Sequence, residues 1–286
     1  MDQTKLIRQR IENISNIPTL PIVIEKITRL LQNPQTSAEE IGKAITTDQA
    51  IASKVLRLVN SAFYGFPGRI STITHAIVIL GFSTVKNIVL TASIFDFFKK
   101  RGDSHPEFDL EKFWIHSIAC GAASQSIARF IGFAEKEECF IGGLIHDIGK
   151  IILCQYLPDE FSRIVLNVKK KDILFVDSER EIIGMTHQEI GGTVVARWNL
   201  PRNLQEVVNF HHQPLPSREF YTITSIVHCA DILVRALDCG SGGDSKIPLV
   251  SEGAWQKLGL GNISLPLLLE EMTDEIQKAT ALMALV

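Results

Sequence analysis

Apolar residues recur three and four positions apart along most of the chain, as in "IVIEKITRLL" at 22–31 and "IASKVLRLVNSAF" at 51–63. This spacing places apolar side chains on one face of an α-helix. The alternation typical of half-buried strands is scarce, and turn clusters such as "NPQT" and "YGFPGR" separate segments of helical length. The pattern therefore predicts an all-α fold.

Two of the predicted helices carry start signals. Ser37 and Glu40 have the spacing of a capping box, in which the hydroxyl and the carboxylate satisfy orphan amides of the first turn. Thr186 and Glu189 repeat it, which puts His187 in a first helical turn. The segment "KKRGDSHPEFD" at 99–109 has the composition of a connection. We therefore expect two helical parts, residues 1–105 and residues 106–286.

Composition indicates a globular chain, since 45% of its 286 residues are hydrophobic and 21% are charged. Residues 1–105 hold 13 Lys and Arg against 8 Asp and Glu, and the remainder holds 16 against 24, without a dense basic patch. Direct nucleic-acid binding is therefore not expected. Neither a signal-peptide block nor a long uncharged apolar run occurs, which predicts a cytoplasmic protein without membrane contact. The five cysteines lack C-x-x-C spacing and are expected to be free thiols.

After residue 109, single polar residues interrupt otherwise apolar helices. In "LIHDIGK" at 144–150, an imidazole and a carboxylate lie side by side within one predicted helix, and a lysine follows one turn later. A buried charge is costly unless it is paired or bound to a metal. The other polar residues in these helices whose side chains can bind a metal are His116, His187, His211, His212 and Asp231. Imidazole and carboxylate are the ligands of Zn, Mn, Fe, Co and Ni sites, and a shared carboxylate bridges two ions. Taken singly, each histidine is more often a structural residue.

The doublet in "LIHDIGK", with "WIHSIACG" upstream and "CADIL" downstream, resembles the HD superfamily, which includes many metal-dependent phosphohydrolases. Over residues 17 to 236, elements such as "IPTLP" and "NSAFYG" closely resemble the HDOD family, the HD-related output domains of bacterial signalling proteins. This resemblance implies an N-terminal helical subdomain followed by an HD-type helical bundle. It also implies a regulatory role in signal transduction, exercised through a signalling protein partner.

The histidines also resemble those of the HD-GYP phosphodiesterases, which hydrolyse cyclic di-GMP. That resemblance implies two divalent transition-metal ions (Fe, Mn, Zn, Ni or Co), one held by His116, His146, Asp147 and Asp231 and one by Asp147, His187, His211 and His212. It gives catalytic roles to Asp147 and to Lys150, whose ammonium would contact a substrate phosphate. Two departures are visible. Gln213 replaces the glutamate after the double histidine and no Gly-Tyr-Pro segment follows, and Lys112 occupies the position of a third-metal carboxylate.

Three hypotheses remain open from the sequence. The first is a regulatory HDOD protein that retains a dinuclear metal site, favoured because the regulatory family matches over most of the chain. The second is a metal-dependent phosphodiesterase or phosphohydrolase acting on a nucleotide, a cyclic dinucleotide or another phosphoester, favoured by the complete ligand set. In the third, every histidine is structural. His228 is expected to support the site or to pack, and the glycine-rich segment 238–248 is expected to be flexible surface chain.

Overall fold

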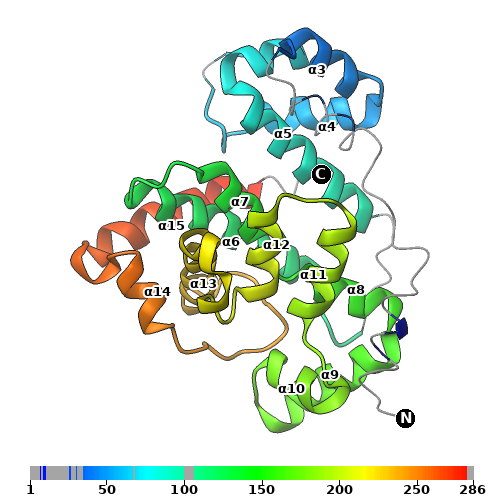
Figure 1. The fold of residues 1–286 in the computed structure, drawn as a ribbon, viewed down its shortest axis with the longest axis vertical. Helices are drawn as coiled ribbons and strands as arrows, with labels where there is room; N and C mark the ends of the chain where they lie inside the picture. The colour runs from blue at the N-terminus through cyan, green and yellow to red at the C-terminus, as the bar shows by residue number, and fades with distance from the viewer. Residues whose placement is uncertain are drawn as a thin grey trace. The chain divides into compact units, whose positions relative to one another are not determined.

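The computed structural model describes residues 35–66, 68–99 and 106–281, together with residues 7, 9, 10, 26 and 30. The element "IPTLP" and most of the predicted helix at 22–31 lie outside these residues. The described part of the chain consists of α-helices, short 3-10 helices and their connections, with no extended strand (Figure 1). The predicted all-α fold is confirmed.

The chain divides into two compact units, residues 18–102 with 277–286, and residues 103–276 with 1–17. The division expected from the sequence, 1–105 and 106–286, has a similar internal boundary but assigns the two chain ends differently. As a statement about domains it stays a prediction.

The first of these units contains α3 (Ala38–Thr46), α4 (Gln49–Val59) and α5 (Ile73–Lys99). The capping box of Ser37 and Glu40 opens α3 as predicted. After α4, the side chain of Asn60 bonds both backbone groups of Ile70 and closes the intervening turn. Within α5, residues Ile73–Ser93 are long and apolar enough to cross a membrane. Of the apolar window in that stretch, 44% is buried inside the protein, and the core helix of a soluble protein meets the same criteria.

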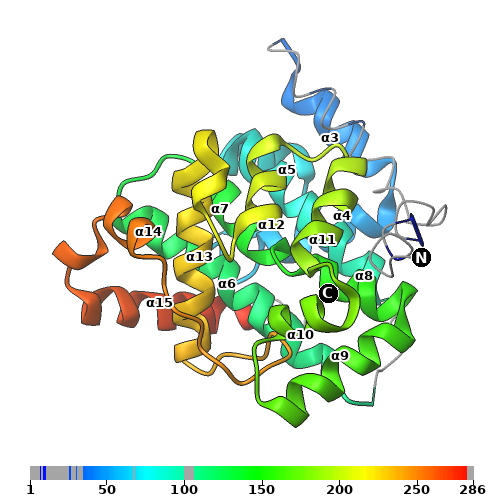
Figure 2. The same cartoon turned by 60° about the horizontal axis from the view of Figure 1, so that its bottom comes forward.

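The second unit carries the polar clusters found in the sequence. Its elements are α6 (Leu110–Phe130), α7 (Lys136–Ile145), α8 (Ile148–Tyr156), α9 (Pro158–Lys171), α10 (Phe175–Ile183), α11 (His187–Arg197), α12 (Arg202–Phe210), η1 (Leu215–Phe220), α13 (Tyr221–Ala236), α14 (Glu252–Lys257), η2 (Leu260–Asn262) and α15 (Leu265–Thr280) as far as residue 276. The long helix α6 packs against α7 and α13, and α11 packs against α8 and α12 (Figure 2).

Two glycines allow these helices to approach closely. A Cβ atom on Gly143 of α7 would lie 2.5 Å from the carbonyl oxygen of Cys120 on α6. A Cβ atom on Gly149 of α8 would lie 1.9 Å from the carbonyl oxygen of His187 on α11. Because these glycines flank residues 146 and 147, the two close contacts fix the doublet between α6 and α11.

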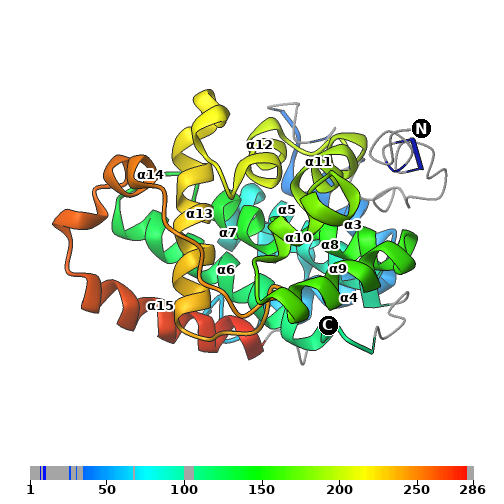
Figure 3. The same cartoon turned by 90° about the horizontal axis from the view of Figure 1, so that it is seen from below.

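The helix near the C-terminus, α15, is amphipathic. Leu268, Met272 and Ile276 lie four residues apart on α15 and are buried. On the polar side, Arg129 of α6 pairs with Glu271 and Glu275. Figure 3 shows α15 beside α6 and α13, so this helix covers part of the unit that holds the site.

Candidate metal centre

The His146–Asp147 doublet lies at a junction between two helices, not inside one. The sequence predicts a single helix through this segment, but α7 ends at Ile145 and α8 begins at Ile148. Asp147 has φ −95° and ψ 11°, so the backbone turns at the doublet. The prediction of one helix was wrong, because the helix is interrupted at the doublet and apolar spacing does not reveal such an interruption.

The structure brings the seven predicted metal ligands into one cluster. They come from five places in the chain: α6, the α7–α8 junction, the start of α11, the end of α12 and the middle of α13. All are buried except His212, which is partly exposed: His116, His146, Asp147, His187, His211, His212 and Asp231. The capping box of Thr186 and Glu189 is present and begins α11 at His187, as predicted.

Asp147 lies between two groups of imidazoles. Its Oδ2 atom is 3.4 Å from Nε2 of His146 and 3.9 Å from Nε2 of His116. Its Oδ1 atom is 3.1 Å from Nε2 of His187 and 3.6 Å from Nε2 of His211. A carboxylate that presents one oxygen to each group has the arrangement of a ligand shared between two metal ions.

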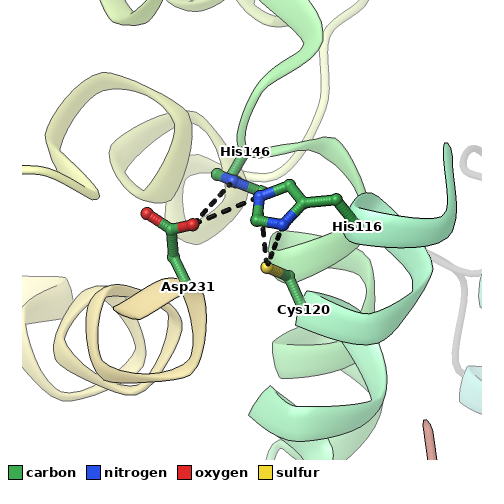
Figure 4. A group of neighbouring side chains, drawn as sticks. All are labelled: His116, Cys120, His146 and Asp231. Atoms are coloured by element: carbon green, nitrogen blue, oxygen red, sulfur yellow. Dashed lines mark hydrogen bonds and ion pairs between the residues drawn. The ribbon is translucent and has the colours of Figure 1, made fainter. Parts of the chain in front are cut away.

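The first group is completed by residues of α6 and α13 (Figure 4). Asp231 Oδ1 lies 3.2 Å from Nε2 of His116 and 3.9 Å from Nε2 of His146. The sulfur of Cys120 lies 3.6 Å from Nε2 of His116. One donor atom from each of these four residues lies within 4.8 Å of the others, so a single ion can reach all of them.

Three imidazoles are oriented by hydrogen bonds at Nδ1. The acceptors are the Gly143 carbonyl for His146 at 2.6 Å, the Glu179 carboxylate for His187 at 2.7 Å and the Val208 carbonyl for His211 at 3.1 Å. Because these oxygens only accept, Nδ1 carries the proton, and in the neutral ring Nε2 presents a lone pair to the centre of the cluster.

The inward lone pairs fit a divalent cation. Around Nε2 of His187 lie Asp147 Oδ1 at 3.1 Å, His211 Nε2 at 3.3 Å and His212 Nε2 at 3.1 Å. One proton on His187 satisfies one of these three atoms, whereas a metal ion binds all of them together. Within the described chain, the buried Nε2 of His146 and Oδ1 of Asp147 form no hydrogen bond. Buried polar atoms without partners are uncommon, and these belong to ligand types that bind transition metals.

The pKa values of the histidines are shifted in different directions. Burial lowers the pKa of His211 to about 3 and holds the pKa of His212 well below its usual value, so both are neutral at neutral pH. Burial also acts to lower the pKa of His187, but the carboxylates of Glu179 and Asp147 together outweigh it and raise that pKa. Since a metal binds neutral imidazole, competition with protons extends to higher pH at His187 than at the first two residues.

Lys150 is buried and bonded on two sides. Its Nζ donates to Asp147 Oδ2 at 2.6 Å and to the carbonyl of Gly242 at 2.8 Å. Burial alone would raise the pKa of Asp147, but His146 and Lys150 hold it well below its usual range, so the carboxylate is ionised. Lys150 is thus bonded to a candidate metal ligand, and its contact with a substrate phosphate stays a prediction.

The connection between α13 and α14, residues 237–251, is called the strap below. The expectation that 238–248 is flexible surface chain was wrong for Gly242 and for the side chain of Asp244, which are buried and bonded, whereas Ser245 and Ile247 are exposed. Arg235 joins Asp231 Oδ1 to Asp244 Oδ1, at 3.0 Å on each side, and the backbone N–H of Phe175 donates to Asp244 at 2.9 Å. The strap runs from the end of α13 past α10 to α14 (Figure 2). Composition does not reveal these contacts, because their partners lie far away in the sequence.

The sequence reasoning missed three residues of this site. Cys120 and Arg235 each follow a candidate ligand by four residues on a helix, which is a signal that spacing offers. Glu179 gives no local signal, since it lies on α10 and meets His187 only through the tertiary fold. The supporting role expected for His228 is present, because its Nδ1 bonds the carbonyl of His211 at 2.7 Å.

A pocket of about 280 Å³ adjoins the cluster. Its polar lining includes Lys150, His212 and Arg235. Its apolar lining comes from α10 and its approach, from α13 and from the strap: Leu174, Phe175, Val176, Ile232, Pro248 and Leu249. The pocket therefore gives a small molecule access to the His212 side of the cluster.

An all-helical fold around a buried cluster of histidines and aspartates suited to divalent metal defines a protein of the HD type. The model of the HDOD domain family matches residues 17–214, and the chain belongs to this family. An uncharacterized protein of Treponema pallidum (strain Nichols) is 26% identical over 239 residues, which are 82% of this chain and 45% of that protein. The chain thus spans about half the length of this curated relative.

Solved structures share the fold. An HDOD domain protein of unknown function from Geobacter sulfurreducens has a TM-score of 0.82 and 25% identity, covering 99% of this chain and 98% of that one. A protein from Shewanella amazonensis SB2B, provisionally named a phosphohydrolase, has a TM-score of 0.73 and 21% identity, covering 96% and 97%. A protein from Marinobacter aquaeolei VT8, provisionally named a signal transduction protein, has a TM-score of 0.73 and 18% identity, covering 99% and 64%.

Proposed function

We propose that this HDOD protein is a regulatory component of a signalling pathway and binds two divalent transition-metal ions at its HD-type site. The position of Asp147, with one carboxylate oxygen toward each group of imidazoles, is the observation that carries the proposal. The first ion would be held by His116, His146, Asp147 and Asp231, and the second by Asp147, His187, His211 and His212. Nitrogen and oxygen donors of this kind suit Fe, Mn, Zn, Ni or Co.

The number of ions is tested by metal analysis of the full chain purified without chelators. We expect two equivalents in the wild type, loss of both in Asp147→Ala, and loss of one in His116→Ala or His212→Ala. His75→Ala is a matched control, since this histidine lies on α5 and is not one of the clustered residues. Less than one equivalent in the wild type, or equal content in wild type and Asp147→Ala, would contradict the proposal.

A signalling partner belongs to this proposal, because a regulatory protein acts by changing the state of another molecule. We expect the metal-loaded chain and metal-free Asp147→Ala to differ in the protein that they cross-link in cells. Identical cross-linking patterns would remove the link between the metal site and regulation, while leaving metal binding itself intact.

The pocket favours a second candidate function, metal-dependent hydrolysis of a phosphoester. Two divalent ions held by these residues would lower the pKa of a bound water and neutralise charge on phosphoryl oxygens. The chain itself would supply a pocket for the ester, with Lys150 and Arg235 at its polar wall. A nucleotide or cyclic dinucleotide is the class of ligand expected from the resemblance of the histidines.

Catalysis is tested with Mn- or Fe-loaded protein and a panel of mononucleotides, cyclic dinucleotides and simple phosphoesters. The enzyme hypothesis predicts turnover that Asp147→Ala abolishes and that Lys150→Ala strongly reduces. Turnover no higher than the Asp147→Ala background across the panel would leave the regulatory function as the supported one.

A further inference from the structure

A single ammonium group connects the proposed metal centre to the strap. Nζ of Lys150 lies 2.6 Å from Asp147 Oδ2 and 2.8 Å from the carbonyl oxygen of Gly242, and the side chain is fully buried. The same carboxylate oxygen faces the imidazoles of His116 and His146. The ammonium and the first proposed metal ion would therefore share one oxygen atom of Asp147.

Charge opposes simultaneous binding of the two cations. An ammonium and a divalent ion on one carboxylate repel each other, and the repulsion is strong where water is excluded. Without the metal, Lys150 compensates the buried negative charge of Asp147, which would be costly to leave unpaired. With the metal, the ion takes over this compensation, and the ion pair of Lys150 is weakened.

The surroundings of Lys150 offer the ammonium another position. Lys150 lines the pocket of about 280 Å³, and its Nζ lies 5.1 Å from the centre of the Phe175 ring. A movement toward the pocket takes the ammonium away from Asp147 and changes its bond to Gly242. The strap has a second anchor, from Arg235 to Asp244.

We infer that Lys150 is an internal cation that bound metal displaces from Asp147, and that this displacement couples metal occupancy to the order of the strap near Gly242. The inference rests on the proposed metal centre and describes how that centre is regulated. Farther along, the strap exposes the apolar side chains of Ile247 and Leu249, which are 56% and 96% accessible, so a change in its order reaches the protein surface.

Metal affinity tests the first half of the inference. Lys150→Met removes the charge, and Lys150→Gln removes the charge but keeps a hydrogen-bond donor. Both variants of the full chain are expected to bind Zn²⁺ about tenfold or more tightly than the wild type in chelator competition, because each removes the repulsion between the ammonium and the ion at one carboxylate. Lys112→Met is the matched control, because this exposed lysine of α6 lies one turn before His116 and carries the same charge.

Amide hydrogen exchange of the strap tests the second half. The N–H of Gly243 donates to Ser241 Oγ at 3.2 Å, which makes it a reporter beside Gly242. In the wild type, Zn²⁺ is expected to accelerate exchange in the segment 241–243 several-fold. In Lys150→Met, exchange there is expected to be fast already and independent of metal. Because coupling between two sites is reciprocal, a change that loosens the strap is also expected to raise the affinity for metal.

The outcomes separate this inference from the proposed function. If the wild type binds no metal, both are overturned. If the wild type binds metal but neither Lys150 variant binds it more tightly than Lys112→Met does, the inference alone is overturned. Zn²⁺ that slows exchange at 241–243 or leaves it unchanged in the wild type also overturns it, and this measurement needs no variant. Circular dichroism of each metal-loaded variant confirms that the fold is retained.

Discussion

Glu179 provides the sharpest test of how the cluster is organised. Its Oε2 atom accepts from Nδ1 of His187 at 2.7 Å and from the backbone N–H of the same residue at 3.0 Å, and the carboxylate is fully buried. These two bonds fix both the ring orientation and the position of the proton on Nδ1. Glu179→Gln keeps the shape of the side chain but replaces the negative oxygen pair by a neutral amide.

The expected effect is a loss of metal affinity at the His187 side. Carboxylates that accept from a metal-binding histidine raise its basicity, and their replacement costs about 10- to 100-fold in affinity. This range corresponds to about 1.4 to 2.7 kcal/mol, because a tenfold change in an equilibrium constant is about 1.36 kcal/mol. Only the second ion is affected directly, since Glu179 touches none of the ligands proposed for the first.

Chelator competition on the full chain measures this loss for each ion separately. Glu181→Gln is the matched control, because Glu181 lies on the same helix but is exposed and pairs with Lys171. Unchanged affinity for both ions in a folded Glu179→Gln variant would refute the reasoning. So would an equal loss in the Glu181→Gln control, which would indicate a general charge effect in place of a specific bond to His187.

Three further predictions concern other links between sequence, packing and binding. Glu179 raises the pKa of His187, and a metal competes with the proton on this residue. The affinity for the second ion, measured by chelator competition, is therefore expected to fall as the pH drops from about 8 to about 6. An affinity that does not change with pH would contradict this. Gly149→Ala places a methyl group 1.9 Å from the carbonyl oxygen of His187. In urea titration it is expected to lower the free energy of unfolding by about 1–3 kcal/mol or more. Gly261→Ala is the control that should be tolerated, because its methyl group would lie 3.7 Å from the nearest atom. Ser37→Ala removes the N-cap of α3 and is expected to cost about 1 kcal/mol, seen as a lower urea midpoint; an unchanged midpoint would show that the capping box contributes nothing to stability.

Two helix starts were predicted because their signals are local. The capping boxes at Ser37 and Thr186 lie at the helix starts that their spacing indicates. The junction at Asp147 was not predicted, since no glycine or proline lies at the doublet to mark the end of a helix. The apolar spacing indicates which face of a helix is buried, but it does not indicate where the helix is interrupted.

The sequence by itself determined the all-α fold, the family and the chemistry of the candidate ligands, because these depend on residue types and short spacings. Only the tertiary structure decided that the ligands from five parts of the chain meet around Asp147. It also decided that Glu179 orients His187, and that the strap is tied to the cluster through Lys150 and Arg235. These contacts join residues far apart in the sequence, and such contacts form only when the packing of the helices brings their side chains within hydrogen-bonding distance.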